Sequence, residues 1–243
     1  MNIYENIYIG SFIYQLGIKV GKKGLENKSA VNLFQQTPAD SKLSDLIQSV
    51  NGTYLIIEFK RDSADKKENK KAKKLEEELN KPENIHLIEI SESCHYIGIG
   101  TITNEATINF YKYLKYFKDN ELFEIDNFID NFLNHNKKLS FKEILYEYNK
   151  VGINNSQKFL EYIKFLQKIY NSGIKSSTGG IIIHKDENGR LSMLPTDNIE
   201  NLIKNIDKTI HTLQNKIQEK LFKQKNRGQY KERSWLKINL RVI

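Results

Sequence analysis

Apolar residues recur along the chain with two different periods, and the period predicts which segments form helices and which form strands. A helical period covers residues 4–19, where apolar side chains gather on one side. Four shorter apolar runs predict strands at 30–36, 43–50, 53–61 and 85–90. A lysine- and glutamate-rich segment predicts a helix at 63–80. The predicted order is therefore helix, three strands, helix, strand.

The pair Asn51-Gly52 between two apolar runs predicts a tight hairpin, because a type I′ turn needs positive φ at both central positions. A loop of these two residues fixes the register and brings Asp45 opposite Glu58. Side chains alternate along a strand, so Lys60 shares the face of Glu58. The sequence thus predicts one cluster of two carboxylates and an ammonium group.

The expected surroundings of this cluster are apolar on both faces of the strand, which is typical of a strand that is covered on both sides. Opposed carboxylates repel each other, and Lys60 neutralises only one of them. A hard divalent cation bound by oxygen ligands would compensate the remaining charge. The alternative is a structural ion-pair cluster at a solvated end of the sheet.

Asp45, the hairpin and the run Glu58-Phe59-Lys60 together resemble the core motif of the PD-(D/E)xK nuclease superfamily. The resemblance implies an α/β fold with a restriction-endonuclease-like αβββαβ core and a mixed sheet over residues 1–103. It also implies that Asp45 and Glu58 hold Mg²⁺ or Mn²⁺, with the Phe59 carbonyl as a further ligand. Lys60 would then orient or activate the attacking water.

The chain departs from the family motif at one position, since residue 44 is Ser rather than Pro. Pro38 and Asp40 offer a rival Pro-x-Asp match. We favour Asp45 because its place in the hairpin brings it opposite Glu58.

In this family the first helix often supplies a further metal-binding carboxylate, and Glu5 is the candidate here. Glu26 is less favoured because it falls in a predicted loop. The alternative for Glu5 is a solvated residue of the first helical turn, where the helix dipole stabilises an acidic side chain.

The net charge of +8 predicts a polyanionic partner. Four lysines, Lys66, Lys67, Lys70 and Lys71, lie in the first half of the predicted helix 63–80, and glutamates follow in its second half. This order opposes the helix dipole, which favours acids first and bases last. We therefore expect these lysines to contact nucleic-acid phosphates, with a solvated charged face as the alternative. The family resemblance favours DNA over RNA.

Residues 104–243 are expected to form a mainly helical region. Its predicted helices are 108–116, 122–133, one opened by the capping box Ser140-x-x-Glu143, and 159–170. A hairpin is predicted at 179–194, and a long amphipathic helix at 197–225. The apolar stripe 199–221 of that helix predicts contact with the body of the protein, a partner protein or a second copy of the chain.

Several classes of protein are not favoured by the sequence. The single cysteine, Cys94, excludes an internal disulfide. His95 adjoins it, and neighbours on a strand point to opposite faces, so we expect neither a zinc site nor a nucleophilic pair. No apolar run approaches the length of a membrane span, and Glu5 interrupts any signal-peptide pattern. A cytoplasmic protein is expected.

These observations predict a magnesium-dependent endonuclease that hydrolyses phosphodiester bonds in DNA. By family association alone, it would serve antiviral defence of the host against foreign DNA. The alternative is a non-catalytic subunit that binds nucleic acid or protein and retains a nuclease-like fold.

Overall fold

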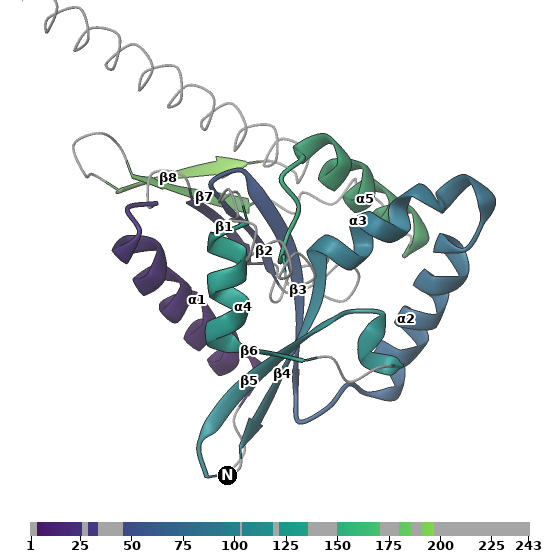
Figure 1. The fold of residues 1–243 in the computed structure, drawn as a ribbon, viewed down its shortest axis with the longest axis horizontal. Coiled ribbons are helices and arrows are strands. Elements are labelled where there is room, and N and C mark those ends of the chain that lie inside the picture. The colour runs from purple at the N-terminus through teal and green to yellow at the C-terminus, as the bar shows by residue number, and fades with distance from the viewer. Residues whose placement is uncertain are drawn as a thin grey trace, which may run out of the picture. The chain divides into compact units, whose positions relative to one another are not determined.

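A computed structural model describes residues 4–25, 29–33, 46–102, 104–118, 122–135, 150–170, 180–185 and 191–196 (Figure 1). All of these residues belong to one compact unit that spans Met1–Ile206. Several predicted features lie outside the described residues: Glu26, Pro38, Asp40, Ser44, Asp45, the capping box Ser140-x-x-Glu143 and the helix 197–225.

The helices are α1 (Glu5–Lys22), α2 (Lys66–Leu79), α3 (His86–Cys94), α4 (Ile125–Leu133) and α5 (Ser156–Ile169), with the short 3₁₀ helices η2 (Pro82–Asn84) and η3 (Lys115–Phe117). The strands are β1 (Ser29–Leu33), β2 (Leu46–Val50), β3 (Thr53–Arg61), β4 (His95–Ile102), β5 (Ala106–Lys112), β6 (Phe123–Glu124), β7 (Gly180–Lys185) and β8 (Leu191–Thr196). None of the described helices is both long and apolar enough to cross a membrane.

The main sheet is mixed, with the strand order β1-β2-β3-β4-β5-β6. Strands β3 and β4 are parallel, and the other neighbouring pairs are antiparallel. Strands β7 and β8 pair in a separate antiparallel sheet, which confirms the hairpin expected at 179–194. The described part of the chain therefore has an α/β fold built on a mixed sheet.

The hairpin of β2 and β3 turns at Asn51 and Gly52, whose φ angles are 51° and 77°. Positive φ at both positions is what a type I′ turn requires. Val50 lies opposite Thr53, and Leu46 lies opposite Ile57. The predicted register is confirmed as far as Leu46.

Helices cover both faces of β3. On one face, Phe59 packs near Phe12 of α1, with ring centroids 5.8 Å apart, and the core there extends to α4. On the other face, Tyr54 stacks on Phe159 of α5 at 5.2 Å. Figure 1 shows α1 and α4 on one side of the sheet and α2, α3 and α5 on the other. Two-sided cover explains why β3 is apolar on both faces.

The strand expected at 85–90 is wrong, because residues 86–90 belong to α3 and Ile85 is its N-cap. Its buried residues Leu87, Ile90, Ser91 and Cys94 follow a helical spacing. The strand next to β3 is β4, which begins only at His95.

The helix expected at 108–116 is also wrong. Residues Ala106–Lys112 form β5, in which Ile108 and Phe110 are buried with the two-residue period of a strand. The helices expected at 122–133 and 159–170 are confirmed by α4 and α5. Strands β5 and β6 follow the boundary expected at residue 103, yet they extend the same sheet as β4.

Candidate functional site

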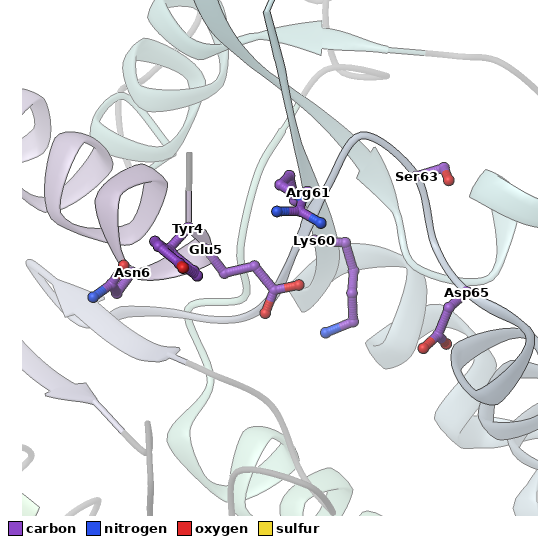
Figure 2. Close-up of a pocket in the computed structure, with 7 residues that line it drawn as sticks. All are labelled: Tyr4, Glu5, Asn6, Lys60, Arg61, Ser63 and Asp65. Carbon is purple, nitrogen blue, oxygen red and sulfur yellow. The ribbon is translucent and has the colours of Figure 1, made fainter. Parts of the chain in front are cut away.

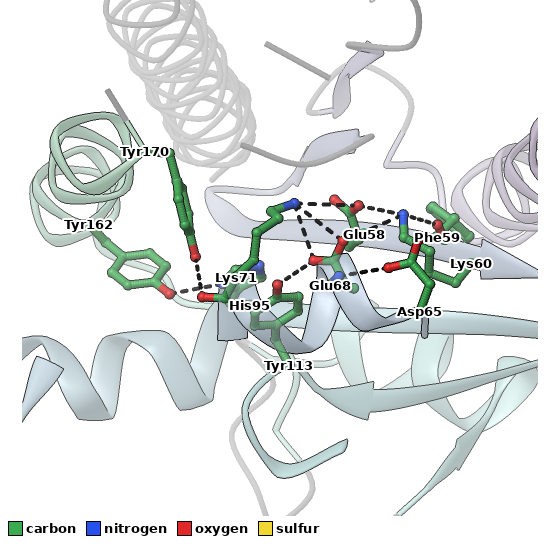
Figure 3. A network of polar contacts seen from close by, with 10 residues as sticks. All are labelled: Glu58, Phe59, Lys60, Asp65, Glu68, Lys71, His95, Tyr113, Tyr162 and Tyr170. Atoms are coloured by element: carbon green, nitrogen blue, oxygen red, sulfur yellow. Dashed lines mark hydrogen bonds and ion pairs between the residues drawn. The ribbon is translucent and has the colours of Figure 1, made fainter. Parts of the chain in front are cut away.

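Glu58 and Lys60 lie on one face of β3, near its end (Figure 3). Glu58 is 3% exposed, and the Lys60 side chain is 16% exposed. The Lys60 Nζ donates hydrogen bonds to Glu58 Oε1 at 2.5 Å and to the Phe59 carbonyl oxygen at 2.8 Å. The predicted pairing of Glu58 with Asp45 stays a prediction, because Asp45 lies outside the described residues.

Helix α2 adds a second acid–base pair, Glu68 and Lys71. The Asp65 side chain caps the helix by accepting a hydrogen bond from the Glu68 backbone N–H at 2.7 Å. The buried face of α2 then carries Glu68 beside Ala72, Leu75 and Leu79. These residues recur at helical spacing, so Glu68 is turned toward the sheet.

Lys71 lies within ion-pair distance of both carboxylates, those of Glu58 and Glu68. Its Nζ lies 3.2 Å from Glu68 Oε1 and 3.6 Å from Glu58 Oε1, and its side chain is 13% exposed. Lys60 Nζ lies 3.9 Å from Glu68 Oε2. We call Glu58, Lys60, Glu68 and Lys71 the charge cluster. Its two carboxylates and two ammonium groups balance formally.

Burial makes the charged form of the Glu58 carboxyl group unfavourable. Desolvation raises its pKa to about 7, and the nearby charge of Glu68 adds to this rise, against the lowering effect of Lys71 and Lys60. Its second oxygen, Oε2, has no hydrogen-bond partner among the described residues. A buried oxygen of this kind is a position at which a cation, a water molecule or a proton would be stabilised.

Aromatic and polar side chains contact the cluster on its buried side. The Tyr113 hydroxyl donates a hydrogen bond to Glu68 Oε1, and its ring stacks on His95 at 4.1 Å. His95 Nδ1 lies 2.9 Å from the Tyr162 hydroxyl. Burial lowers the pKa of His95 to about 3, so this imidazole is neutral near pH 7. Cys94, the last residue of α3, is also buried, and its burial raises the pKa of the thiol.

An open pocket of about 540 Å³ borders the cluster where α1 begins and β3 ends (Figure 2). Its lining residues are Tyr4, Glu5, Asn6, Lys60, Arg61, Ser63 and Asp65. The carboxylate of Glu5 points toward Lys60 across this pocket. The fold therefore brings Glu5, a predicted metal ligand, to the side of Lys60 that faces solvent.

The four lysines predicted to contact nucleic acid are divided between two environments. Lys66, Lys67 and Lys70 are exposed on α2. Lys71 points inward and belongs to the charge cluster. Three of the four thus remain candidates for contact with phosphates, and Lys71 needs a different explanation.

The oxygen atoms around Glu58 are the candidate ligands for a divalent cation. No group of three or more His, Cys, Asp or Glu side chains is arranged around a metal position in the described part of the chain. The Lys60 ammonium already donates to Glu58 Oε1 and to the Phe59 carbonyl oxygen, so Oε2 is the oxygen of Glu58 that the described residues leave for a cation. Mg²⁺ often uses only one or two carboxylates and keeps several waters. The described atom that fits such a cation is buried Glu58 Oε2, which has no hydrogen-bond partner among the described residues.

The partners of the cluster on α2, at the start of β4 and just after β5 were not foreseen from the sequence. Glu68 carried a signal, because it occupies a position in the apolar stripe of α2 that a charged residue ordinarily avoids. Tyr113 and His95 carried none, since their roles depend on contacts between distant segments.

Comparisons with known proteins did not assign the chain to a family. A scan against protein-family models found no match. Searches of curated proteins and of solved structures found no similar chain either.

Proposed function

We propose that the protein is a metal-dependent nuclease with a restriction-endonuclease-like core. The observation that carries this proposal is the pairing of buried Glu58 with Lys60 at the edge of an open pocket. The Glu58 carboxylate is buried and has one oxygen without a partner in the described part of the chain. Next to an ammonium group that reaches an open pocket, it suits the hydrolysis of an anionic substrate.

The order of the elements supports the proposed core. Helix α1 precedes the antiparallel strands β1, β2 and β3, and β4 returns parallel to β3 after α2 and α3. This matches the αβββαβ order that the resemblance implies, with α3 as an additional helix. The Glu58-Phe59-Lys60 run then lies on the third strand, where the family carries its motif.

In the proposed mechanism Asp45, Glu58 and the Phe59 carbonyl would hold Mg²⁺ or Mn²⁺, and Glu5 would be a further ligand. Such a cation, when bound, makes a coordinated water more acidic and stabilises negative charge on the phosphate. Lys60 orients the attacking water or contacts the scissile phosphate from the pocket. The Glu5 carboxylate points toward Lys60 across the same pocket, which supports its proposed place beside the site.

The substrate in this proposal is DNA. Lys66, Lys67 and Lys70 form an exposed basic face on α2, and the chain carries a net charge of +8. Defence against foreign DNA is part of the same proposal and follows from the family resemblance alone. The proposed place of action, the cytoplasm, rests instead on the cysteine content and hydropathy of the sequence.

The test is an incubation of the protein with duplex DNA, single-stranded DNA or RNA, in Mg²⁺, Mn²⁺ or EDTA. We expect cleavage of DNA with either metal, no cleavage in EDTA, and loss of cleavage in Glu58→Gln and Lys60→Met. Lys73→Met removes an exposed lysine from α2 and is the matched control for charge. Cleavage in EDTA, or full activity of Glu58→Gln, would refute the proposal.

The balanced charges of the cluster favour a second candidate, a non-catalytic subunit that binds nucleic acid or protein. Two ammonium groups already neutralise Glu58 and Glu68 without a metal. A partner protein or a second copy of the chain would bind at residues 199–221, which lie outside the described residues. Binding of DNA without cleavage under every metal condition would favour this candidate.

A further inference from the structure

We propose that Lys71 on α2 is a positioning residue that fixes the Glu58 carboxylate so that its Oε2 atom is presented to a divalent cation. This inference rests on the proposed function and adds to it a residue outside the Glu58-Phe59-Lys60 run. It replaces the expectation that Lys71 contacts nucleic-acid phosphates.

The first argument is which oxygen the lysines hold. Lys60 Nζ lies 2.5 Å from Glu58 Oε1, and Lys71 Nζ lies 3.6 Å from the same oxygen (Figure 3). The two ammonium groups reach Oε1 from different elements, β3 and α2. A carboxylate held through one oxygen from two directions has little freedom to rotate, and its other oxygen keeps a fixed direction.

The second argument is the state of that other oxygen. Glu58 is 3% exposed, and Oε2 has no hydrogen-bond partner among the described residues. An unpartnered buried carboxylate oxygen is unfavourable, and a bound cation would relieve this cost. The arrangement therefore separates the two oxygens of Glu58, one held by the protein and one left for a ligand.

The third argument is that Lys71 is itself held in place. Its Nζ lies 3.2 and 3.4 Å from the two oxygens of Glu68, which also accepts a hydrogen bond from Tyr113. The Tyr170 ring covers the ammonium group at 5.9 Å, and the Tyr170 hydroxyl donates to the Lys71 backbone carbonyl. Lys60 instead lines the pocket. Lys71 is thus the fixed cation of the cluster, and Lys60 is the one that substrate can reach.

The test is calorimetric titration of the full chain with MnCl₂, in the absence of nucleic acid. Outer groups that orient a metal-binding side chain typically contribute about 10- to 100-fold to metal affinity. We expect Lys71→Met to weaken Mn²⁺ binding by about this factor. Lys71→Arg should restore most of the affinity, because a guanidinium group can also donate to both carboxylates. Lys73→Met, with the same loss of charge at an exposed position of α2, should bind Mn²⁺ as the wild type does.

The sign of the change decides between two roles for Lys71. If Lys71 only repels the cation, Lys71→Met should bind Mn²⁺ more tightly than the wild type, and the inference is overturned. Unchanged affinity overturns it as well. In both cases Mn²⁺ binding and DNA cleavage by the wild type would leave the proposed nuclease function standing. A wild-type protein that binds no Mn²⁺ would refute both. Should Lys71→Met fail to fold, Lys71→Gln replaces it in the same titration.

Discussion

Glu58 is a carboxylate that the fold buries while leaving one of its oxygens unpartnered among the described residues. Lys60 and Lys71 only partly offset this burial, because the pKa of Glu58 is still raised to about 7. Placing the negative charge on Glu58 is therefore unfavourable in the metal-free folded protein. A residue chosen only for stability would not carry this penalty, and that is an argument for function at this position.

Glu58→Gln measures the penalty directly, because it replaces the carboxyl group with a neutral amide of similar shape. The pKa of Glu58 is raised from 4.5 to about 7 in the folded state, so the folded wild type keeps a proton that the unfolded chain loses in this pH window. The wild type should therefore lose up to about 3 kcal/mol of stability as the pH rises through the window. We expect the variant to escape this loss and to be at least as stable as the wild type at about pH 8.

Urea unfolding in EDTA across this pH range checks the expectation. Glu77→Gln, which alters an exposed carboxylate on α2, should leave the pH dependence of the wild type unchanged. A Glu58→Gln protein that is destabilised by about 3–5 kcal/mol throughout the range would instead identify a structural ion pair.

The two faces of helix α2 lie in different surroundings. Its inward face carries Glu68 and Lys71 into the charge cluster, and its outward face carries Lys66, Lys67 and Lys70 into solvent. The unfavourable order of charges along the helix is thus explained only in part by the cluster. The cluster accounts for Lys71 but not for the three exposed lysines, for which contact with nucleic acid is the proposal.

Replacing Lys66, Lys67 and Lys70 with Glu should weaken DNA binding for all sequences and flatten its dependence on salt. Each lost phosphate contact lowers the slope of log affinity against log salt by about 0.9 for duplex DNA. Binding measured by fluorescence anisotropy over a range of salt concentrations gives this slope. Replacing three exposed lysines of α5, Lys158, Lys164 and Lys168, with Glu makes the same number of changes on another helix and should lower the slope less. Equal effects of the two sets would mean that α2 is not the binding face.

Local signals were sufficient to predict the hairpin but not the site around it. The Asn51-Gly52 turn fixes its own register, so the placement of Glu58 and Lys60 on one face followed from the sequence. The segment 85–90 was misread because its apolar residues fit both a strand and a helix. Glu68 and Tyr113 could not be placed beside Glu58, since their proximity depends on how α2 packs on the sheet and on the course of the chain after β5.

The main sheet is continuous across the boundary expected at residue 103. Strand β5 pairs with β4 along its whole length, and Tyr54 exchanges backbone hydrogen bonds with Ile153 at 2.8 and 2.9 Å. Phe159 and Tyr162 of α5 cover the face of the sheet that carries the charge cluster. The residues that complete the site are therefore spread over much of the described chain.

A fragment of residues 1–103 should therefore fail to fold as a cooperative unit. It lacks β5, α4 and α5, so one edge and parts of both faces of the sheet would be exposed to water. We expect a broad, non-cooperative thermal transition by circular dichroism. The fragment Met1–Ile206 should give a sigmoidal one. A sigmoidal transition for residues 1–103 would show that the shorter segment is an independent domain.

The parallel pairing of β3 with β4 also determines when the site can form during synthesis. Parallel neighbours cannot be joined by a tight turn, and here the connection runs through residues 62–94 and contains α2. The hairpin that bears Glu58 and Lys60 leaves the ribosome well before β4, and Tyr113 follows later still. A nascent chain at this stage therefore lacks α2 and α5, which cover the face of the hairpin that bears Glu58 and Lys60. Under the proposed function, an unfinished or prematurely terminated chain would be harmless to the DNA of the cell that makes it.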